Sequence, residues 1–591
     1  MKEVFFIYRS LVAQLPAGGG RFMWTYSWLL ASLALFDGIA LGLLALVIGP
    51  LSTGSELELP VLGAIDNSGL VWVVVAICTV LILKSVLAVG VTWWATRRIP
   101  KFEIALGDRL LRAYLRAPWR DRLRRNSTDI MRFSDSGIDA SMNGFLVPGA
   151  TLLSEVVTLV VVMATLSAVA PLLAAVTFTY LVLLGAVLFF WIAKHARRAG
   201  EVNVTQSIRT SRLILEVIAS LKEVTLRNKE AEVAEVVLGS RTSSARARAN
   251  ITFLSELPRF ALEAGLVGGF IVVGGTGYML GGVEYAITAI GLFALAGFRV
   301  APSVIRFQSV LSKMIAAAEF PRQVLSELRA VEDSAAQREI PQGAAPLEPK
   351  VIVFDHVSFR YSPEARLAVN DVSVEIPIGS TVALVGESGS GKSTFVDLLL
   401  SLLEPTSGNI RVDDVPLASI RTSWRSRVGY VPQDVALFDA SIAQNVALTW
   451  GDDFDDRRVK AALERAQLLE VVSAREGGIH ARVGERGLAL SGGQRQRLGI
   501  ARALYSEPLV LVMDEATSAL DTQTEAHVTD AIAAISGNVT KVVVAHRLAT
   551  IKDADSILFM RNGVVAGTGT FDELVARFPD FARQAHLAGL A

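Results

Sequence analysis

The sequence predicts a multidomain chain in which an all-α domain of six transmembrane helices precedes an α/β domain of the P-loop NTPase type. The first sign is hydropathy: 52% of the 591 residues are hydrophobic and the mean hydropathy is +0.45, with most of the excess before residue 310. The second is a glycine-rich loop at 386–394, between an apolar run and a helical pattern. The charge balance bears on function instead: 57 basic and 57 acidic residues give no support to nucleic-acid binding.

The membrane domain is predicted from apolar stretches close to the roughly 20 residues that a helix needs to cross a bilayer. Six such stretches occur, at 24–49, 69–95, 144–168, 171–193, 259–279 and 286–305. Buried helices of soluble proteins could mimic one or two of them, but not six. The predicted domains are therefore an N-terminal interfacial helix at 1–22, a transmembrane domain at 23–333, a linker at 334–350 and a nucleotide-binding domain at 351–591.

The orientation of the spans follows from lysine and arginine. These residues gather before the first span, between the second and third spans, and between the fourth and fifth spans. The connections at 50–68, 169–170 and 279–285 contain neither. Both termini and the nucleotide-binding domain are therefore expected in the cytoplasm, with the chain as a multi-pass protein of a cell membrane.

The loop at 386–394 has the residues that a polyphosphate needs. Its glycines let successive backbone N–H groups face one concavity, and the following helix adds the positive end of its dipole. Lys392 supplies a point charge for the β- and γ-phosphates of ATP, and Ser393 offers a hydroxyl to Mg²⁺. The residues of the predicted ATP cradle are Gly386, Glu387, Ser388, Gly389, Ser390, Gly391, Lys392, Ser393 and Thr394.

A second part of the predicted site follows the apolar run 509–513, which is typical of a buried parallel strand. Asp514 at its end is expected next to Mg²⁺. Glu515 is the candidate general base, because a carboxylate there can orient and deprotonate the attacking water.

Together with three further motifs, these features resemble the ATP-binding cassette (ABC) family over 351–591. The additional motifs are a glutamine loop at Gln433, the Leu-Ser-Gly-Gly-Gln sequence at 490–494 and a lone histidine, His546. Any one motif could be an ordinary turn or a solvated loop, but five in this order are specific. The resemblance implies that Tyr361 stacks on adenine, that Gln433 contacts Mg²⁺, and that His546 contacts the γ-phosphate.

The resemblance also implies a partner. In this family the Leu-Ser-Gly-Gly-Gln motif closes over the ATP held by another cassette, so that one chain cannot complete a site. Because Glu515 and His546 are both present, a homodimer with two composite sites is expected. The residues placed at that seam by the resemblance are Ser491, Gly492, Gly493, Gln494 and Asp521.

The membrane half resembles exporter-type cassette proteins, because its cytoplasmic connections are long enough to continue the spanning helices beyond the bilayer. Within that resemblance, the stretches 126–131 and 217–224 lie where coupling helices dock on the cassettes. Ordinary helix turns are the alternative interpretation of both.

Cations in or near the spans are the best sequence clue to a substrate. Lys84, Arg259 and Arg299 are costly at such depth unless they face a cavity or a partner. The segments 257–260 and 298–306 are similar to those of bacterial lipid-linked oligosaccharide flippases, which implies that these cations hold the diphosphate of a polyprenyl-linked glycan in a bacterial plasma membrane. Lys84 stands where that family has an arginine, and it lacks the planar fork.

Alternatives remain for these cations. Arg259 could pair with Glu256 or Glu263 on its own helix. Asp37 and Glu155 could pair with the cations across the bundle, and all three cations could extend to the inner headgroups. At the level of function, the alternatives are an exporter of hydrophobic drugs or ordinary lipids, and a membrane-anchored regulatory ATPase that transports nothing.

Overall fold

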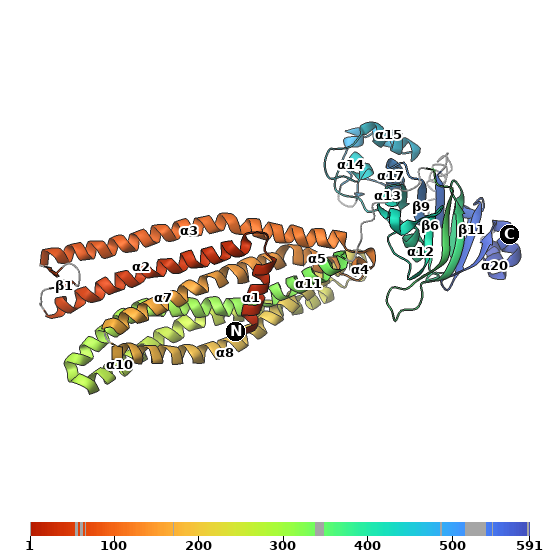
Figure 1. Cartoon of the computed structure of the whole chain (residues 1–591). Coiled ribbons are helices and arrows are strands. Elements are labelled where there is room, and N and C mark those ends of the chain that lie inside the picture. Colours follow the sequence, from red (N-terminus) through yellow and green to blue (C-terminus); the bar gives the residue numbers. More distant parts are fainter. Residues whose placement is uncertain are drawn as a thin grey trace. The chain divides into compact units, whose positions relative to one another are not determined.

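The computed structural model describes residues 2–53, 57–59, 63–65, 67–169, 171–336, 348–484, 487–514, 539–545, 548–587 and 590. The chain divides into two compact units. A helical unit comprises Met1–Ala117 and Arg122–Gln337, and an α/β unit comprises Pro118–Asp121 and Arg338–Ala591 (Figure 1).

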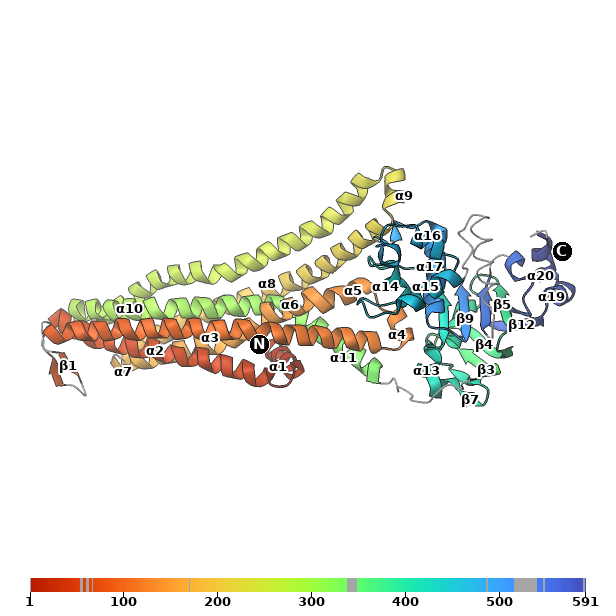
Figure 2. The ribbon, with the colours of Figure 1, turned by 90° about the horizontal axis from the view of Figure 1, so that it is seen from above.

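Long helices that run side by side build the helical unit (Figures 1 and 2). They are α2 (Gly19–Thr53), α3 (Asn67–Arg116), α7 (Val147–Val169), α8 (Pro171–Ala219) and α10 (Glu230–Ala317). α10 covers both of the last two predicted spans, and it is broken at Gly281 and Gly282, where the φ of +73° at Gly282 favours glycine. Among the described residues, four helices are long and apolar enough to cross a membrane: Val71–Arg116, Asp129–Thr165, Ala174–Ala219 and Glu230–Ile287.

Shorter elements connect and flank these helices. The strands β1 (Leu57–Leu59) and β2 (Gly63–Ile65) pair antiparallel between α2 and α3. α9 joins α8 to α10 at one end of the unit (Figure 2). The remaining helices are α1 (Lys2–Gln14), α4 (Trp119–Leu123), α5 (Ser127–Arg132), η1 (Phe133–Gly137), α6 (Ile138–Ser141), η2 (Met142–Leu146), α9 (Leu221–Leu226) and α11 (Glu319–Ala336).

Burial in the helical unit is that of a membrane protein. A core around Leu11 of α1, Met142 and Phe145 is fully buried. Elsewhere large apolar side chains point outward, such as Trp72 and Phe190, each 73% exposed. Apolar surface on this scale is costly in water and suits lipid. The chain is therefore an integral membrane protein.

The α/β unit contains two sheets. The larger has the strand order β12-β11-β5-β10-β9-β8 and is parallel except for β12. Its strands are β5 (Thr381–Gly386), β8 (Val428–Val431), β9 (Val510–Asp514), β10 (Thr540–Val544), β11 (Ser556–Arg561) and β12 (Val564–Gly569). The smaller is antiparallel, in the order β4-β3-β6-β7. Its strands are β3 (Val351–Phe359), β4 (Val369–Pro377), β6 (Ser407–Val412) and β7 (Val415–Pro416).

The helices of the α/β unit bury the parallel strands, which explains why β5 and β9 are almost wholly apolar in sequence. The α-helices are α12 (Lys392–Leu399), α13 (Arg421–Arg425), α14 (Ile442–Ala447), α15 (Asp456–Arg465), α16 (Leu469–Ser473), α17 (Gly492–Tyr505), α19 (Phe571–Arg577) and α20 (Pro579–Leu587). The short 3-10 helices are η3 (Leu417–Ile420), η4 (Gly478–His480) and η6 (Leu548–Ile551).

One finding was not predicted. Pro118–Asp121, which follows α3 in sequence, belongs to the α/β unit. Trp119 packs against the hydrophobic core of that unit, and Arg120 Nε donates a hydrogen bond to Tyr361 O at 2.8 Å. The sequence prediction singled out 126–131 and 217–224. α5 covers most of the first stretch and belongs to the helical unit, and the docking role of both stretches stays a prediction.

Candidate functional sites

The loop between β5 and α12 has backbone angles that only glycine adopts easily. Gly389 and Gly391 have φ of +78° and +104°. A Cβ on Gly391 would lie 2.3 Å from Ala368 O, so any side chain there would clash with backbone. Gly391 also caps the N-terminus of α12, whose first N–H groups have no partner within the helix. The loop thus has the geometry that the sequence predicted for a phosphate cradle.

Two polar side chains of this loop fit an anion. Lys392 is 6% exposed, and its Nζ donates to Gly386 O at 2.7 Å and to Glu387 O at 2.9 Å. The amine is therefore held over the loop itself. Ser390 is 4% exposed, and its Oγ has no hydrogen-bond partner among the described residues. A buried hydroxyl in this state is satisfied by an acceptor such as a phosphate oxygen.

Tyr361 lies beside the same loop. Its Oη and Thr394 Oγ1 are 3.1 Å apart in a hydrogen bond, and its ring packs edge-on against Phe359 at 5.0 Å between centroids. The structure therefore brings the predicted adenine-stacking residue to the last residue of the predicted cradle. The ring is half-buried, and its stacking on adenine stays a prediction.

The predicted Mg²⁺ residues gather at one edge of the larger sheet. Val544 of β10 pairs with Leu384 of β5 on one side and with Asp514 of β9 on the other. Asp514 and the cradle that follows β5 are thus at the carboxyl edge of the parallel strands, where α/β sheets bind ligands. Gln433 follows β8, the neighbour of β9, and is exposed; Ser393 is exposed at the start of α12.

This donor set suits Mg²⁺ bound together with a nucleotide. Asp514 offers a carboxylate, Ser393 a hydroxyl and Gln433 an amide oxygen, all hard ligands, and Mg²⁺ takes its other ligands from phosphate and water. Within the described ranges, no group of three or more histidine, cysteine or acidic side chains is arranged to hold a metal.

The sequence prediction missed two groups beside Asp514. Asp397 lies on α12, one turn after Ser393. Burial, and after it the charge of Asp514, raises the pKa of Asp397 to about 6. A hydrogen bond with Trp119 acts in the opposite direction and lowers this pKa. Tyr430 of β8 donates to Asp514 Oδ2 at 3.4 Å, and its pKa is raised, chiefly by burial. The four-residue spacing of Ser393 and Asp397 on one helix face was the available signal.

The Leu-Ser-Gly-Gly-Gln motif forms the exposed N-terminus of α17. Ser491 is the N-cap: its Oγ accepts from Gln494 N at 3.3 Å, and Gln494 Oε1 accepts from Ser491 N at 3.1 Å. This capping box uses a lone pair of the Ser491 oxygen and leaves its O–H donor for another acceptor. Ser491 and Gly492 are exposed and Gly493 is buried, so the motif presents a helix N-terminus to solvent.

Three predicted nucleotide-site residues lie outside the described residues: Glu515, Asp521 and His546. Glu515 is the next residue after Asp514 at the end of β9, and His546 is two residues beyond β10. Their roles stay predictions.

Carboxylates partner two of the three predicted substrate cations. Lys84 Nζ lies 2.5 Å from Asp37 Oδ2 on α2, and Arg259 Nε lies 3.0 Å from Glu263 Oε1 on the same helix. For these two cations the structure has the ion pairs that the sequence left as alternatives. The side chain of Arg299 lies outside the described residues.

Comparisons with known proteins agree with this architecture. Residues 369–518 match the ABC transporter family. The chain is 45% identical over 227 residues to an "ATP-dependent lipid A-core flippase" of Ralstonia nicotianae, 38% of each chain. It is 47% identical over 236 residues to "Beta-(1-->2)glucan export ATP-binding/permease protein NdvA" of Bradyrhizobium diazoefficiens, 40% of this chain and 39% of the other. The matches thus span about two fifths of the length of these relatives.

A solved structure extends the likeness to nearly the whole chain. It is described as "Structure of a bacterial Atm1-family ABC exporter with ATP bound", and it aligns with a TM-score of 0.73 over 95% of this chain and 96% of that one. Sequence identity is 22%, so the likeness concerns the fold.

Proposed function

We propose that this chain, an ABC exporter half-transporter by its fold and its ABC ATPase domain, uses ATP hydrolysis to move a lipid-linked molecule across a bacterial plasma membrane. The observation that carries the proposal is the loop at 386–394. It combines backbone angles that favour glycine, a buried lysine and an unpartnered buried serine at the sheet edge where Asp514 ends its strand.

The residues divide the work of hydrolysis. Lys392 exchanges its carbonyl partners for phosphate oxygens, while Ser393, Gln433 and Asp514 hold Mg²⁺. When bound there, Mg²⁺ would neutralise charge that develops on the phosphates. Glu515 orients and deprotonates the water, and His546 contacts the γ-phosphate. Tyr361 stacks on adenine.

A second copy of the chain completes each site. Support comes from the exposed N-terminus of α17, where Ser491 keeps an O–H donor while its oxygen caps the helix. Such a terminus favours the γ-phosphate of ATP bound to the other copy. The proposed assembly is a homodimer with two composite sites, and the family resemblance implies that Asp521 contributes to the seam. The ATPase domain faces the cytoplasm.

The proposed substrate is a polyprenyl-diphosphate-linked oligosaccharide, flipped from the inner to the outer leaflet. The names of two relatives, a lipid A-core flippase and a glucan exporter, support a lipid-linked or glycan cargo. Arg259, whose side chain is 59% exposed, is accessible to a diphosphate. Lys84 and Arg299 would complete the proposed diphosphate site. Lys84 and Arg259 would exchange Asp37 and Glu263 for the phosphate.

A second candidate is an exporter of hydrophobic drugs or ordinary lipids. The ion pair of Lys84 with Asp37 favours it, because a neutralised cation has less attraction for an anionic headgroup. A third candidate is a regulatory ATPase that moves no substrate.

Stimulation of ATPase activity separates these candidates. Purified protein in liposomes is given a polyprenyl-diphosphate glycolipid, the matching uncharged polyprenol, or a hydrophobic drug. We expect stimulation by the glycolipid alone. Stimulation by the drug or by the polyprenol to the same extent supports the second candidate, and no response to any of the three supports the third.

A further inference from the structure

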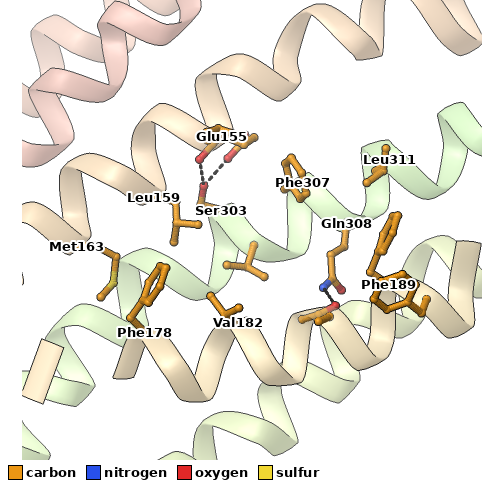
Figure 3. Close-up of a pocket in the computed structure, with 15 residues that line it drawn as sticks. Glu155, Leu159, Met163, Phe178, Val182, Phe189, Ser303, Phe307, Gln308 and Leu311 are labelled. Atoms are coloured by element: carbon orange, nitrogen blue, oxygen red, sulfur yellow. Dashed lines mark hydrogen bonds between the residues drawn. The ribbon is translucent and has the colours of Figure 1, made fainter. Parts of the chain in front are cut away.

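The helical unit contains an apolar pocket of about 390 Å³, between α7, α8 and the second half of α10 (Figure 3). Its volume lies in the range of about 300–1,000 Å³ that ligand pockets occupy. The walls are aromatic and aliphatic, with Leu159 and Met163 from α7, Phe178 and Phe189 from α8, and Phe307 from α10. Neither Lys84 nor Arg259, the two predicted substrate cations whose side chains are described, lines it.

Gln308 places a single open acceptor in this apolar wall. Its side chain is 6% exposed, and Nε2 donates to Gly185 O at 3.0 Å. The carbonyl of Gly185 only accepts, which fixes the orientation of the amide. Oε1 has no hydrogen-bond partner among the described residues. A buried amide oxygen in this state favours a ligand that brings a donor.

Gly185 of α8, whose carbonyl accepts this hydrogen bond, leaves room for the Gln308 amide. A Cβ on Gly185 would lie 3.2 Å from Gln308 Nε2, closer than side chains normally pack. Glycine at this position of α8 therefore lets the amide reach the carbonyl. Gln308 is held by the fold and is not a side chain free to turn to solvent.

Glu155 and Ser303 are the other polar residues of the wall, and the charge of Glu155 is already compensated. Its Oε2 accepts from Ser303 Oγ at 2.7 Å, and its Oε1 accepts from Arg306 Nε at 2.7 Å (Figure 3 for Ser303). Arg306 also reaches Oε2 at 3.2 Å, so the pair is bidentate. The pocket wall therefore has no uncompensated charge among these residues, and it favours an uncharged ligand group.

We propose that this pocket binds a lipid chain that carries a hydrogen-bond donor such as a hydroxyl. The chain lies among the phenylalanine rings and the hydroxyl donates to Gln308 Oε1. This inference goes beyond the proposed function, because a polyprenyl chain carries no such donor and the occupant is therefore a different, hydroxylated lipid. A water at Gln308 is the competing occupant. A buried water needs two to four polar partners, and Gln308 Oε1 is the unpartnered acceptor that the described wall residues offer.

Paired photoreactive probes test the proposal on the full chain in phosphatidylcholine liposomes. One is a 16-carbon fatty acid with a diazirine, and the other is the same acid with a hydroxyl on its chain. After illumination, labelled peptides of α7, α8 and α10 are quantified by mass spectrometry. We expect the hydroxylated probe to label pocket residues about two- to ten-fold more, which is what one neutral hydrogen bond supports.

Three variants locate the effect. Gln308→Met keeps the length of the side chain and removes the acceptor, so it should equalise the two probes while apolar labelling persists. Ala186→Trp, on the pocket wall, should reduce labelling by both. Val187→Trp introduces the same bulk one residue away, at a position 63% exposed and outside the wall, and should change nothing.

Equal labelling by the two probes in the unmodified protein would overturn the proposal and leave water as the occupant of the Gln308 site. If Gln308→Met fails to fold, equal loss of labelling in Ala186→Trp and Val187→Trp would overturn it as well. Glycolipid flipping is measured in the same vesicles. If the hydroxylated probe is preferred but no flipping occurs, the pocket proposal is supported and the proposed function is contradicted. If flipping occurs but neither probe is preferred, the proposed function is supported and the pocket proposal is contradicted.

Discussion

Lys84 on α3 forms an ion pair with Asp37 on α2, with Nζ 2.5 Å from Oδ2. The Asp37 side chain is 8% exposed, and Lys84 supplies a positive charge that compensates its carboxylate. An ion pair between two helices fixes their register, and it competes with any anionic ligand for the same amine. Its role in structure and its role in transport can be separated by mutation.

We expect Lys84→Met to destabilise the protein by about 2–3 kcal/mol, because removal of one partner leaves a buried charge. The double variant Lys84→Met with Asp37→Asn should recover most of that loss. Thermal unfolding in detergent measures both. If the ion pair is only structural, the double variant also recovers glycolipid-stimulated ATPase; if Lys84 binds diphosphate, stability returns but stimulation does not. A single variant as stable as the unmodified protein would contradict the pairing.

Asp397 predicts a pH dependence of stability. Its pKa is about 6 in the folded protein and near 3.8 when unfolded. As pH rises, the unfolded chain loses this proton first, so folded stability falls between pH 4 and pH 6 and stays lower above that. Asp397→Asn removes the cost of burying the charged carboxylate and should stabilise the nucleotide-free protein at pH 7.5. We expect a gain of at most about 2 kcal/mol, because the partial exposure of Asp397 reduces the effect of the pKa shift on stability. Thermal unfolding at pH 7.5 and pH 4.5 checks it: an equal gain at both values would refute the assignment.

Ser491 has two separable roles. Ser491→Ala should destabilise the α/β unit by about 1 kcal/mol through loss of the N-cap, and should lower ATPase activity. Ser491→Asp keeps a good N-cap and brings negative charge to the proposed γ-phosphate contact, so stability should persist while ATPase activity is lost. Unfolding and ATPase assays on the two variants test this. Full activity in Ser491→Asp would argue against a second nucleotide contact at α17.

Trp119 joins Pro118–Asp121 to the core of the α/β unit and hydrogen-bonds with Asp397 on the helix that begins with Lys392. Trp119→Phe keeps an aromatic ring and removes the N–H donor. We expect basal ATPase within about two-fold of the unmodified protein and a larger loss of glycolipid stimulation. Trp450→Phe, at a residue 74% exposed, is the control. Equal stimulation in the two variants would show that the hydrogen bond does not couple the units.

Local requirements of the chain were predictable. The glycines of 386–394 and the apolar strand before Asp514 each depend on neighbours within a few residues. Asp397 was missed because its pKa arises from burial and from Asp514, more than a hundred residues away. The partner of Lys84 was left open because pairing between helices cannot be derived from spacing within one helix.

The pocket at Gln308 was missed for a similar reason. Its wall joins α7 and α8 to the end of α10, which lies more than a hundred residues later in the sequence. Gly185 and Gln308 meet only when α8 and α10 pack together. The sequence did predict the fold class, because hydropathy and the order of the cassette motifs report on whole domains.

The central claim is that ATP hydrolysis drives lipid movement, and flipping in proteoliposomes tests it most directly. A fluorescent polyprenyl-diphosphate glycolipid is incorporated, and its exposure in the outer leaflet is followed with and without ATP and Mg²⁺, beside Glu515→Gln. The account predicts ATP-dependent flipping that Glu515→Gln abolishes while ATP remains bound. Brisk ATP hydrolysis without any flipping, or flipping that continues in Glu515→Gln, would contradict it.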